Sequence, residues 1–161
     1  MQNIDLICIG KMNASYFAQG VAEYHKRLGG FCNFRIIELP EVQIADKNAS
    51  DKQIAKALQK EGEAILASVR KGAYLVALCV EGKQISSEEL ATMLADRAIS
   101  GAGDIAFVIG SSHGLDDSVK RAAQARISMG RITLPHQLAR LVLTEQLYRA
   151  CTINAGMKYH K

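Results

Sequence analysis

The chain of 161 residues lacks several patterns that would place it in a class at once. Its four cysteines form no C-x-x-C pair, so neither a disulfide framework nor a zinc site is expected; Cys8 and Cys79 are predicted to be reduced and buried. No apolar run approaches the length of a membrane span. The apolar start is broken by Asp5 and Lys11, so no signal peptide is expected. We therefore expect a soluble cytoplasmic protein with no metal and no membrane partner.

The common nucleotide-binding signatures are missing as well. Neither a Walker A motif nor G-x-G-x-x-G is present, which argues against the ordinary ATP and dinucleotide sites. Internal repeats and low-complexity segments are also lacking. The net charge of +4 is mildly basic, which is compatible with a nucleic-acid partner but equally typical of many soluble enzymes.

What is present is a regular alternation of strand and helix patterns. Apolar runs predict buried strands at 4–9, 34–39, 74–80, 105–109 and 127–129. Capping boxes at Ser50–Gln53 and Ser86–Glu89 begin two of the predicted helices, and residues 41–49 read as a surface loop. The pattern predicts a single domain over residues 1–161 with an α/β fold, a mainly parallel sheet and helices on both faces. Ligands of such sheets bind at the carboxyl ends of the strands.

The stretch 132–150 runs from a short extended piece into a helix that is apolar on most sides, with Pro135 expected at its first helical position. Glu145 and Arg149 form an i, i+4 pair that is expected to be structural. One polar arc also interrupts the apolar surface, and it consists of His136, Gln137, Arg140 and Thr144. A helix this apolar must be buried, either in the core or in a subunit interface.

The segment Gly110-Ser-Ser-His-Gly114 follows a predicted strand and precedes a predicted helix, as a nucleophile elbow would. Ser112 would be the nucleophile, and His136 or His160 would complete a triad. Against this, the chain is short for a hydrolase of that kind, and the acids that follow at 116 and 117 look like helix caps. The same loop is suited to cradling a ligand, because small residues let backbone amides approach it closely.

An ordered set of motifs spans the whole chain. It comprises Ile109-Gly-x-x-x-Gly-Leu115, then Thr133-Leu-Pro-His136, Arg140, Glu-Gln-Leu-Tyr-Arg-Ala150 and finally Tyr159-His160. This set resembles the ribosomal RNA large subunit methyltransferase H family, whose members belong to the SPOUT class of S-adenosylmethionine-dependent methyltransferases. The sequence departs from the family at Ser111, where a second glycine is usual. Serine is small, so we expect the pocket to be retained.

The resemblance implies a SPOUT-type trefoil-knotted α/β fold and a homodimer with the last helix in its interface. It also implies transfer of a methyl group from S-adenosylmethionine to N3 of a pseudouridine in the 23S rRNA of assembled ribosomes. The loops implied to hold the cofactor contain Leu78, Gly110, Met129, Gly130, Arg131, Ile132, Thr133 and Leu134.

The acceptor nitrogen carries a proton that must leave, so the reaction needs a base or a cationic group. The resemblance makes four side chains candidates for this role: His136, Arg140, Tyr159 and His160. We expect the tail pair Tyr159–His160 and Arg140 to contribute to the acceptor site, and they could do so across the dimer. His136 could instead only cap or orient its helix.

Two functions of other classes remain compatible with the residues. One is a small α/β serine hydrolase built on Ser112, and the other is a non-catalytic ribosome- or RNA-binding module. Both the methyltransferase and the binding module would contact RNA phosphates. The candidate residues for these contacts are Lys11, Arg27, Arg131, Lys158 and Lys161. Binding of S-adenosylmethionine and transfer of its methyl group to ribosomes would separate the three functions.

Overall fold

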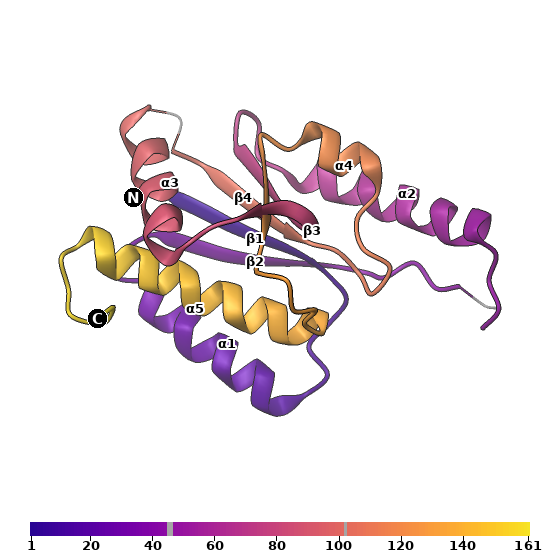
Figure 1. Ribbon diagram of the computed structural model, residues 1–161, viewed down its shortest axis with the longest axis horizontal. Coiled ribbons are helices and arrows are strands. Elements are labelled where there is room, and N and C mark those ends of the chain that lie inside the picture. Colours follow the sequence, from indigo (N-terminus) through magenta and orange to yellow (C-terminus); the bar gives the residue numbers. More distant parts are fainter. Residues whose placement is uncertain (45–46, 102) are drawn as a thin grey trace.

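The computed structural model describes residues 1–44, 47–101 and 103–161, and these residues form one five-stranded sheet flanked by helices (Figure 1). The strands are β1 (Asn3–Ile9), β2 (Asn33–Leu39), β3 (Tyr74–Gln84), β4 (Ile105–Ile109) and β5 (Ala125–Ser128). All neighbouring strands are parallel, in the order β2-β1-β4-β3-β5. The helices are α1 (Ser15–Leu28), α2 (Asp51–Ser68), α3 (Ser87–Ile99), α4 (Asp117–Ala122) and α5 (His136–Asn154). The predicted α/β class is confirmed.

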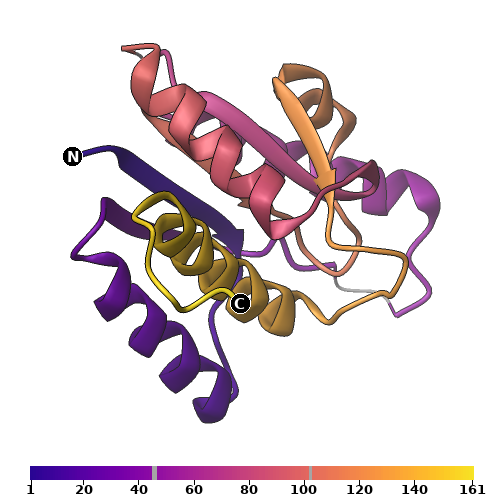
Figure 2. The ribbon, with the colours of Figure 1, turned by 60° about the vertical axis from the view of Figure 1, so that its left-hand side comes forward.

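Helices cover both faces of the sheet (Figures 1 and 2). Along β1, Leu6 and Cys8 point into a core that includes residues of α1, α3 and α5. Ile7 lies in a second core, which includes Ile65 of α2 and Val119 of α4. Successive side chains of a strand point to opposite faces, so a strand between two helical layers is mostly apolar, and the buried Asp5 of β1 is paired with Arg35 and Arg70. This explains the continuous hydrophobic runs in the sequence.

The local signals for helix starts are confirmed. Ser50 and Ser86 each accept a hydrogen bond from the backbone three residues on, and both capping boxes are complete. Asp116 caps α4. Residues 45 and 46 of the predicted surface loop at 41–49 lie outside the described residues, as does residue 102 of the segment Gly101-Ala-Gly103, which is expected to end the helix that begins after Ser86. The described residues of that loop are exposed or partly exposed.

The cysteines are free thiols, as expected. Burial raises the pKa of the Cys8 thiol to about 12. Cys79 is only partly buried, contrary to the prediction. The reason is that Cys79 lies where β3 bends away from the sheet.

Strand β3 extends beyond its predicted end to Gln84. Its register against β5 shifts between Leu78 and Lys83, so that Ile127 pairs with both residues. Gly82 passes so close to β5 that a Cβ atom there would lie 2.5 Å from the carbonyl carbon of Ile127. The chain therefore curves across β5 instead of ending beside it, and glycine is the residue that permits this approach.

Helix α5 packs against α1, α3 and the sheet, and its predicted burial is confirmed. Arg140 and Thr144, which belong to the predicted polar arc, are fully buried beside Leu143 and Leu147. Pro135 is the cap of α5 and not its first helical residue, because its ψ of 145° is extended. Among the described residues, no helix is long and apolar enough to cross a membrane.

Candidate functional site

A pocket of about 320 Å³ opens at the carboxyl ends of β3, β4 and β5. This is the edge of a parallel sheet at which ligands bind. The pocket is lined by the ends of these strands, the loops that follow them and the start of α5. The lining residues are 78–81, 109–111, 113–115, 120, 128–130, 132–134, 136 and 139.

The loop after β4 is a tight turn that contributes one wall. The amide of Gly114 donates a hydrogen bond of 2.9 Å to the carbonyl of Ser111. A Cβ atom at Gly110 would lie 2.3 Å from the carbonyl oxygen of Gly114, so no side chain fits there. The left-handed φ of +92° falls on Gly114, and no described residue other than glycine has a positive φ. Ser111 therefore needs no unusual backbone conformation, and the pocket is retained as expected.

The loop after β5 contributes the opposite wall. The Ser128 hydroxyl donates a hydrogen bond of 3.0 Å to the Gly130 carbonyl and accepts one of 3.2 Å from the Gly130 amide. Gly130 has a φ of +123°, a conformation that favours glycine. Ile132 lines the pocket although it is 80% exposed to solvent. Arg131 is also exposed, but it does not line the pocket.

An ion pair that sequence reasoning missed crosses the pocket wall. Lys120 of α4 lies 2.6 Å from the carboxylate of Glu81, and both residues line the pocket. The hydrogen bond from Lys120 lowers the pKa of Glu81, and Glu81 in turn raises the pKa of Lys120. The partners are far apart in the sequence, and they meet because β3 curves toward α4. No local pattern signals such a pair.

The four predicted catalytic side chains do not meet in one chain. His136 lines the pocket at the start of α5. Arg140 does not line it, because its guanidinium is buried and directed toward the carboxyl ends of β1 and β2. There it donates hydrogen bonds to the carboxylate of Glu38, at 2.5 Å, and to the carbonyl of Gly10, at 2.9 Å.

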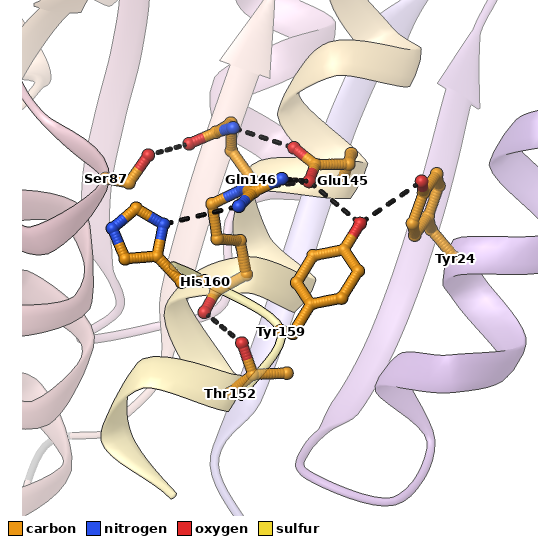
Figure 3. Close-up of polar contacts among 8 residues, drawn as sticks. Tyr24, Ser87, Glu145, Gln146, Thr152, Tyr159 and His160 are labelled. Carbon is orange, nitrogen blue, oxygen red and sulfur yellow. Dashed lines mark hydrogen bonds and ion pairs between the residues drawn. The ribbon is translucent and has the colours of Figure 1, made fainter. Parts of the chain in front are cut away.

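The tail pair packs against the middle and second half of α5, through Glu145 and Arg149 (Figure 3). Tyr159 donates a hydrogen bond of 3.1 Å to Glu145, and His160 Nε2 lies 2.7 Å from Glu88. Glu145 is nine residues beyond His136, which is roughly 14 Å along a helix. The tail of a single chain therefore does not reach that chain's own pocket.

The geometry does not favour a serine hydrolase. Among the described residues, Ser112 shows no hydrogen bond to a histidine or an acid, and the Asp116 side chain is engaged in capping α4. The turn at 110–114 also lacks the strained backbone that a nucleophile elbow uses. Within the described chain, no group of three or more His, Cys, Asp or Glu residues could hold a metal ion.

A family model described as a predicted SPOUT methyltransferase matches residues 2–160. The chain belongs to this family. Its similar curated relatives include the ribosomal RNA large subunit methyltransferase H of Ligilactobacillus salivarius, 50% identical over 159 residues and covering 99% of each chain. The protein of the same name from Streptococcus uberis is 48% identical over 158 residues, which are 98% of this chain and 99% of the relative. The resemblance read from the motifs is confirmed, and this SPOUT methyltransferase is an enzyme.

Two solved structures share the fold of this SPOUT methyltransferase. A probable methylase family protein from Haemophilus influenzae Rd KW20 is 17% identical with a TM-score of 0.52; the match covers 99% of this chain and 71% of that one. A probable methyltransferase from Bordetella pertussis Tohama I is 18% identical with a TM-score of 0.54, and the match covers 92% and 95% of the two chains. At these identities the likeness concerns the fold alone.

Proposed function

We propose that this SPOUT methyltransferase transfers a methyl group from S-adenosylmethionine to N3 of a pseudouridine in 23S rRNA, acting on assembled ribosomes in the cytoplasm. The observation that carries the proposal is the pocket at the carboxyl edge of the sheet. All of the cofactor-binding residues implied by the resemblance line it except Arg131. The names of relatives about 50% identical over nearly the whole chain support the same reaction.

The residues present fit a nucleoside cofactor. The volume of the pocket lies at the lower end of the range for small-molecule sites. Leu78, Met129 and Leu134 would flank the adenine, and the bare backbone at Gly110 and Gly130 would allow hydrogen bonds to its edge. When bound, S-adenosylmethionine supplies a methyl group made electrophilic by its sulfonium.

Replacing Lys120 with methionine is expected to weaken S-adenosylmethionine binding roughly three- to fivefold, because a partly exposed ion pair of this kind contributes up to about 1 kcal/mol. The change frees the curved end of β3 from α4 at the pocket wall. Isothermal titration calorimetry measures the dissociation constant. Lys83→Met is the matched control, since the Lys83–Glu89 pair is exposed and lies 3.8 Å apart outside this pocket. Equal affinities in both variants and the parent would rule out a role for the Glu81–Lys120 pair.

The acceptor imide must lose a proton as the methyl group arrives. We propose that His136, at the pocket and at the start of α5, accepts this proton or orients the acceptor. Burial and the hydrogen bonds with Tyr24 and Glu145 raise the pKa of Tyr159. The phenol therefore stays protonated near neutral pH and would act as a hydrogen-bond donor, not as the base.

We also propose that the enzyme is a homodimer formed through α5. The half-buried side chains Leu138 and Val142 and the 69% exposed Tyr16 of α1 offer apolar surface near the start of α5. Two α5 helices packed antiparallel about a twofold axis would bring the tail of one protomer toward His136 of its partner. This arrangement would unite the catalytic candidates that a single chain keeps apart.

The trefoil knot stays a prediction of the resemblance. The feature that supports it is the passage of β3 across β5 at Gly82, after which the chain returns to α3. A simple parallel strand would not need to cross its neighbour in this way.

Transfer of labelled methyl groups to ribosomes from a strain that lacks the endogenous enzyme tests the proposed function. We expect incorporation into 23S rRNA at one pseudouridine, which mass spectrometry of digested rRNA would locate. Cofactor binding without transfer would favour a ribosome-binding module. A well-folded protein that binds no S-adenosylmethionine would end the methyltransferase proposal.

Replacing Ser112 with alanine should leave methyl transfer within about twofold of the parent, because its hydroxyl has no catalytic partner. A serine hydrolase would instead lose most of its activity, by about 10⁴-fold or more. Ser128→Ala is the comparison variant, since it removes the hydroxyl that holds Gly130 in place. The S-adenosylmethionine dissociation constant of Ser128→Ala should rise, whereas that of Ser112→Ala should not.

A further inference from the structure

We propose that Glu145 and Arg149 are positioning residues that hold the tail pair Tyr159–His160 in one arrangement for the acceptor site. The inference rests on the proposed function, because it assigns the tail to methyl transfer. From the sequence, Glu145 and Arg149 are expected only to be a structural i, i+4 pair. The structure gives the pair a second set of partners, which lie in the tail (Figure 3).

Glu145 is the centre of this network. Its Oε1 accepts hydrogen bonds from Arg149 Nε at 3.0 Å, Arg149 Nη2 at 2.6 Å and the Tyr159 hydroxyl at 3.1 Å. Its Oε2 accepts one of 2.7 Å from Gln146, which in turn accepts a hydrogen bond from Ser87 of α3 (Figure 3). The Glu145 side chain is only 17% exposed. A carboxylate this enclosed depends on its partners, so the tail and the ion pair stabilise each other.

Tyr159 is held on several sides. Its single proton is donated to Glu145, so the Tyr24 hydroxyl, 3.4 Å away, must donate to the Tyr159 oxygen. Its ring packs edge-on against Tyr148, with 4.8 Å between ring centroids, and the Arg149 guanidinium lies 4.7 Å from its centre. The phenol is therefore presented in one orientation and in its protonated form.

Arg149 also selects the tautomer of His160. A guanidinium can only donate, so His160 Nδ1, 3.3 Å from Arg149 Nη1, must be the acceptor. The neutral ring then carries its proton on Nε2, which donates to Glu88 of α3 at 2.7 Å. The hydrogen bond with His160 lowers the pKa of Glu88. Arg149 thus determines both the place of the imidazole and which of its nitrogens bears hydrogen.

This arrangement matters because the tail is short and follows the end of α5. A free tail would have to lose backbone and side-chain entropy as it met the nucleotide, which would raise the barrier to transfer. Glu145 and Arg149 hold the tail in place before the nucleotide binds, so this entropy is lost on folding and not during the reaction. The tail then presents a phenol donor and an imidazole of defined tautomer. Loss of the carboxylate should therefore slow the reaction without disturbing the cofactor pocket at the other end of α5.

The test replaces Glu145 with glutamine and compares it with Glu23→Gln, which alters the equally spaced Glu23–Arg27 pair of α1. Trypsin cleavage after Lys158 releases the tail pair, and intact-protein mass spectrometry follows it without any assay of activity. We expect cleavage to be about tenfold faster in Glu145→Gln and unchanged in Glu23→Gln. We also expect kcat to fall about tenfold in Glu145→Gln, with an unchanged dissociation constant for S-adenosylmethionine.

If Glu145→Gln does not fold, Arg149→Lys takes its place, because lysine keeps the charge and loses the forked contact. Parental cleavage rates, or faster cleavage with parental kcat, would overturn the positioning role. A parent enzyme that transfers no methyl group would instead refute the proposed function, and the cleavage rates would still support or overturn docking of the tail by Glu145.

Discussion

Replacing Gly82 with alanine is expected to lower the free energy of unfolding by about 3 kcal/mol, at the upper end of the usual cost of overpacking. The new Cβ would lie 2.5 Å from the carbonyl carbon of Ile127 and 2.7 Å from its nitrogen and oxygen. These are backbone atoms of a paired strand, so no side-chain rotation relieves the overlap, and β3 must move away from β5. The thermal unfolding midpoint should fall by roughly 10 °C. Cofactor affinity should fall with it, because the pocket residues 79–81 directly precede Gly82.

Gly103→Ala is the matched control for Gly82→Ala. The nearest atom to a Cβ at Gly103 would be 3.7 Å away, which is ordinary van der Waals contact. Alanine should be neutral there or slightly stabilising, because it restricts the unfolded chain. Calorimetry on both variants would refute the close crossing of β3 and β5 if their unfolding midpoints were equal.

Replacing Arg140 with methionine is expected to cost about 2 kcal/mol of stability, because hydrogen bonds to charged groups contribute roughly 1.5–3 kcal/mol. Arg140 is 2% exposed and joins α5 to the ends of β1 and β2 through Gly10 and Glu38. Methionine fills much of the same volume but leaves both partners without their donor. Urea denaturation followed by circular dichroism measures the change.

The Glu38→Gln variant separates the contributions at this site. Glu38 is 39% exposed and water can solvate it, so its replacement should cost only about 1 kcal/mol. The double variant Glu38→Gln/Arg140→Met should lose less than the sum of the single changes, because the two side chains interact directly. Additive losses would mean that the pair contributes nothing to stability. If methyl transfer per folded molecule is normal in Arg140→Lys, the prediction that Arg140 serves the acceptor site is wrong.

Most of the fold could be predicted from periodicity and helix caps. The apolar runs of β1 and β4 indicate that helices cover both faces of the sheet. Ser50, Ser86 and Asp116 are predicted from the local sequence to cap helices, and each does so in the structure. The loops proposed to hold the cofactor could be located because parallel strands end at one edge of the sheet. The proposal that they bind S-adenosylmethionine rests on the resemblance of ordered motifs and not on any physical pattern.

The rest depends on contacts between residues that are distant in the sequence. Nothing near Gly82 indicates that another strand passes within contact of its backbone. The Glu81–Lys120 pair at the pocket wall exists only because of that curve. Arg140 is predicted only as a polar residue on an apolar helix, and its partners Glu38 and Gly10 lie far away in the sequence. Helical spacing predicts the Glu145–Arg149 pair but not the tail that folds back onto it.

The all-parallel sheet has a consequence for the order in which the chain acquires its structure. No two neighbouring strands in the described chain are joined by a tight turn. Each pair of strands must therefore close a long loop, at a cost in chain entropy, before its hydrogen bonds and packing contacts can form. β5 can pair with both Leu78 and Lys83 only after β3 has bent. We therefore expect the pocket, which is made from the ends of β3, β4 and β5, the loops that follow them and the start of α5, to be among the last parts to form. Newly made chains should remain unable to bind cofactor long after their helices have appeared.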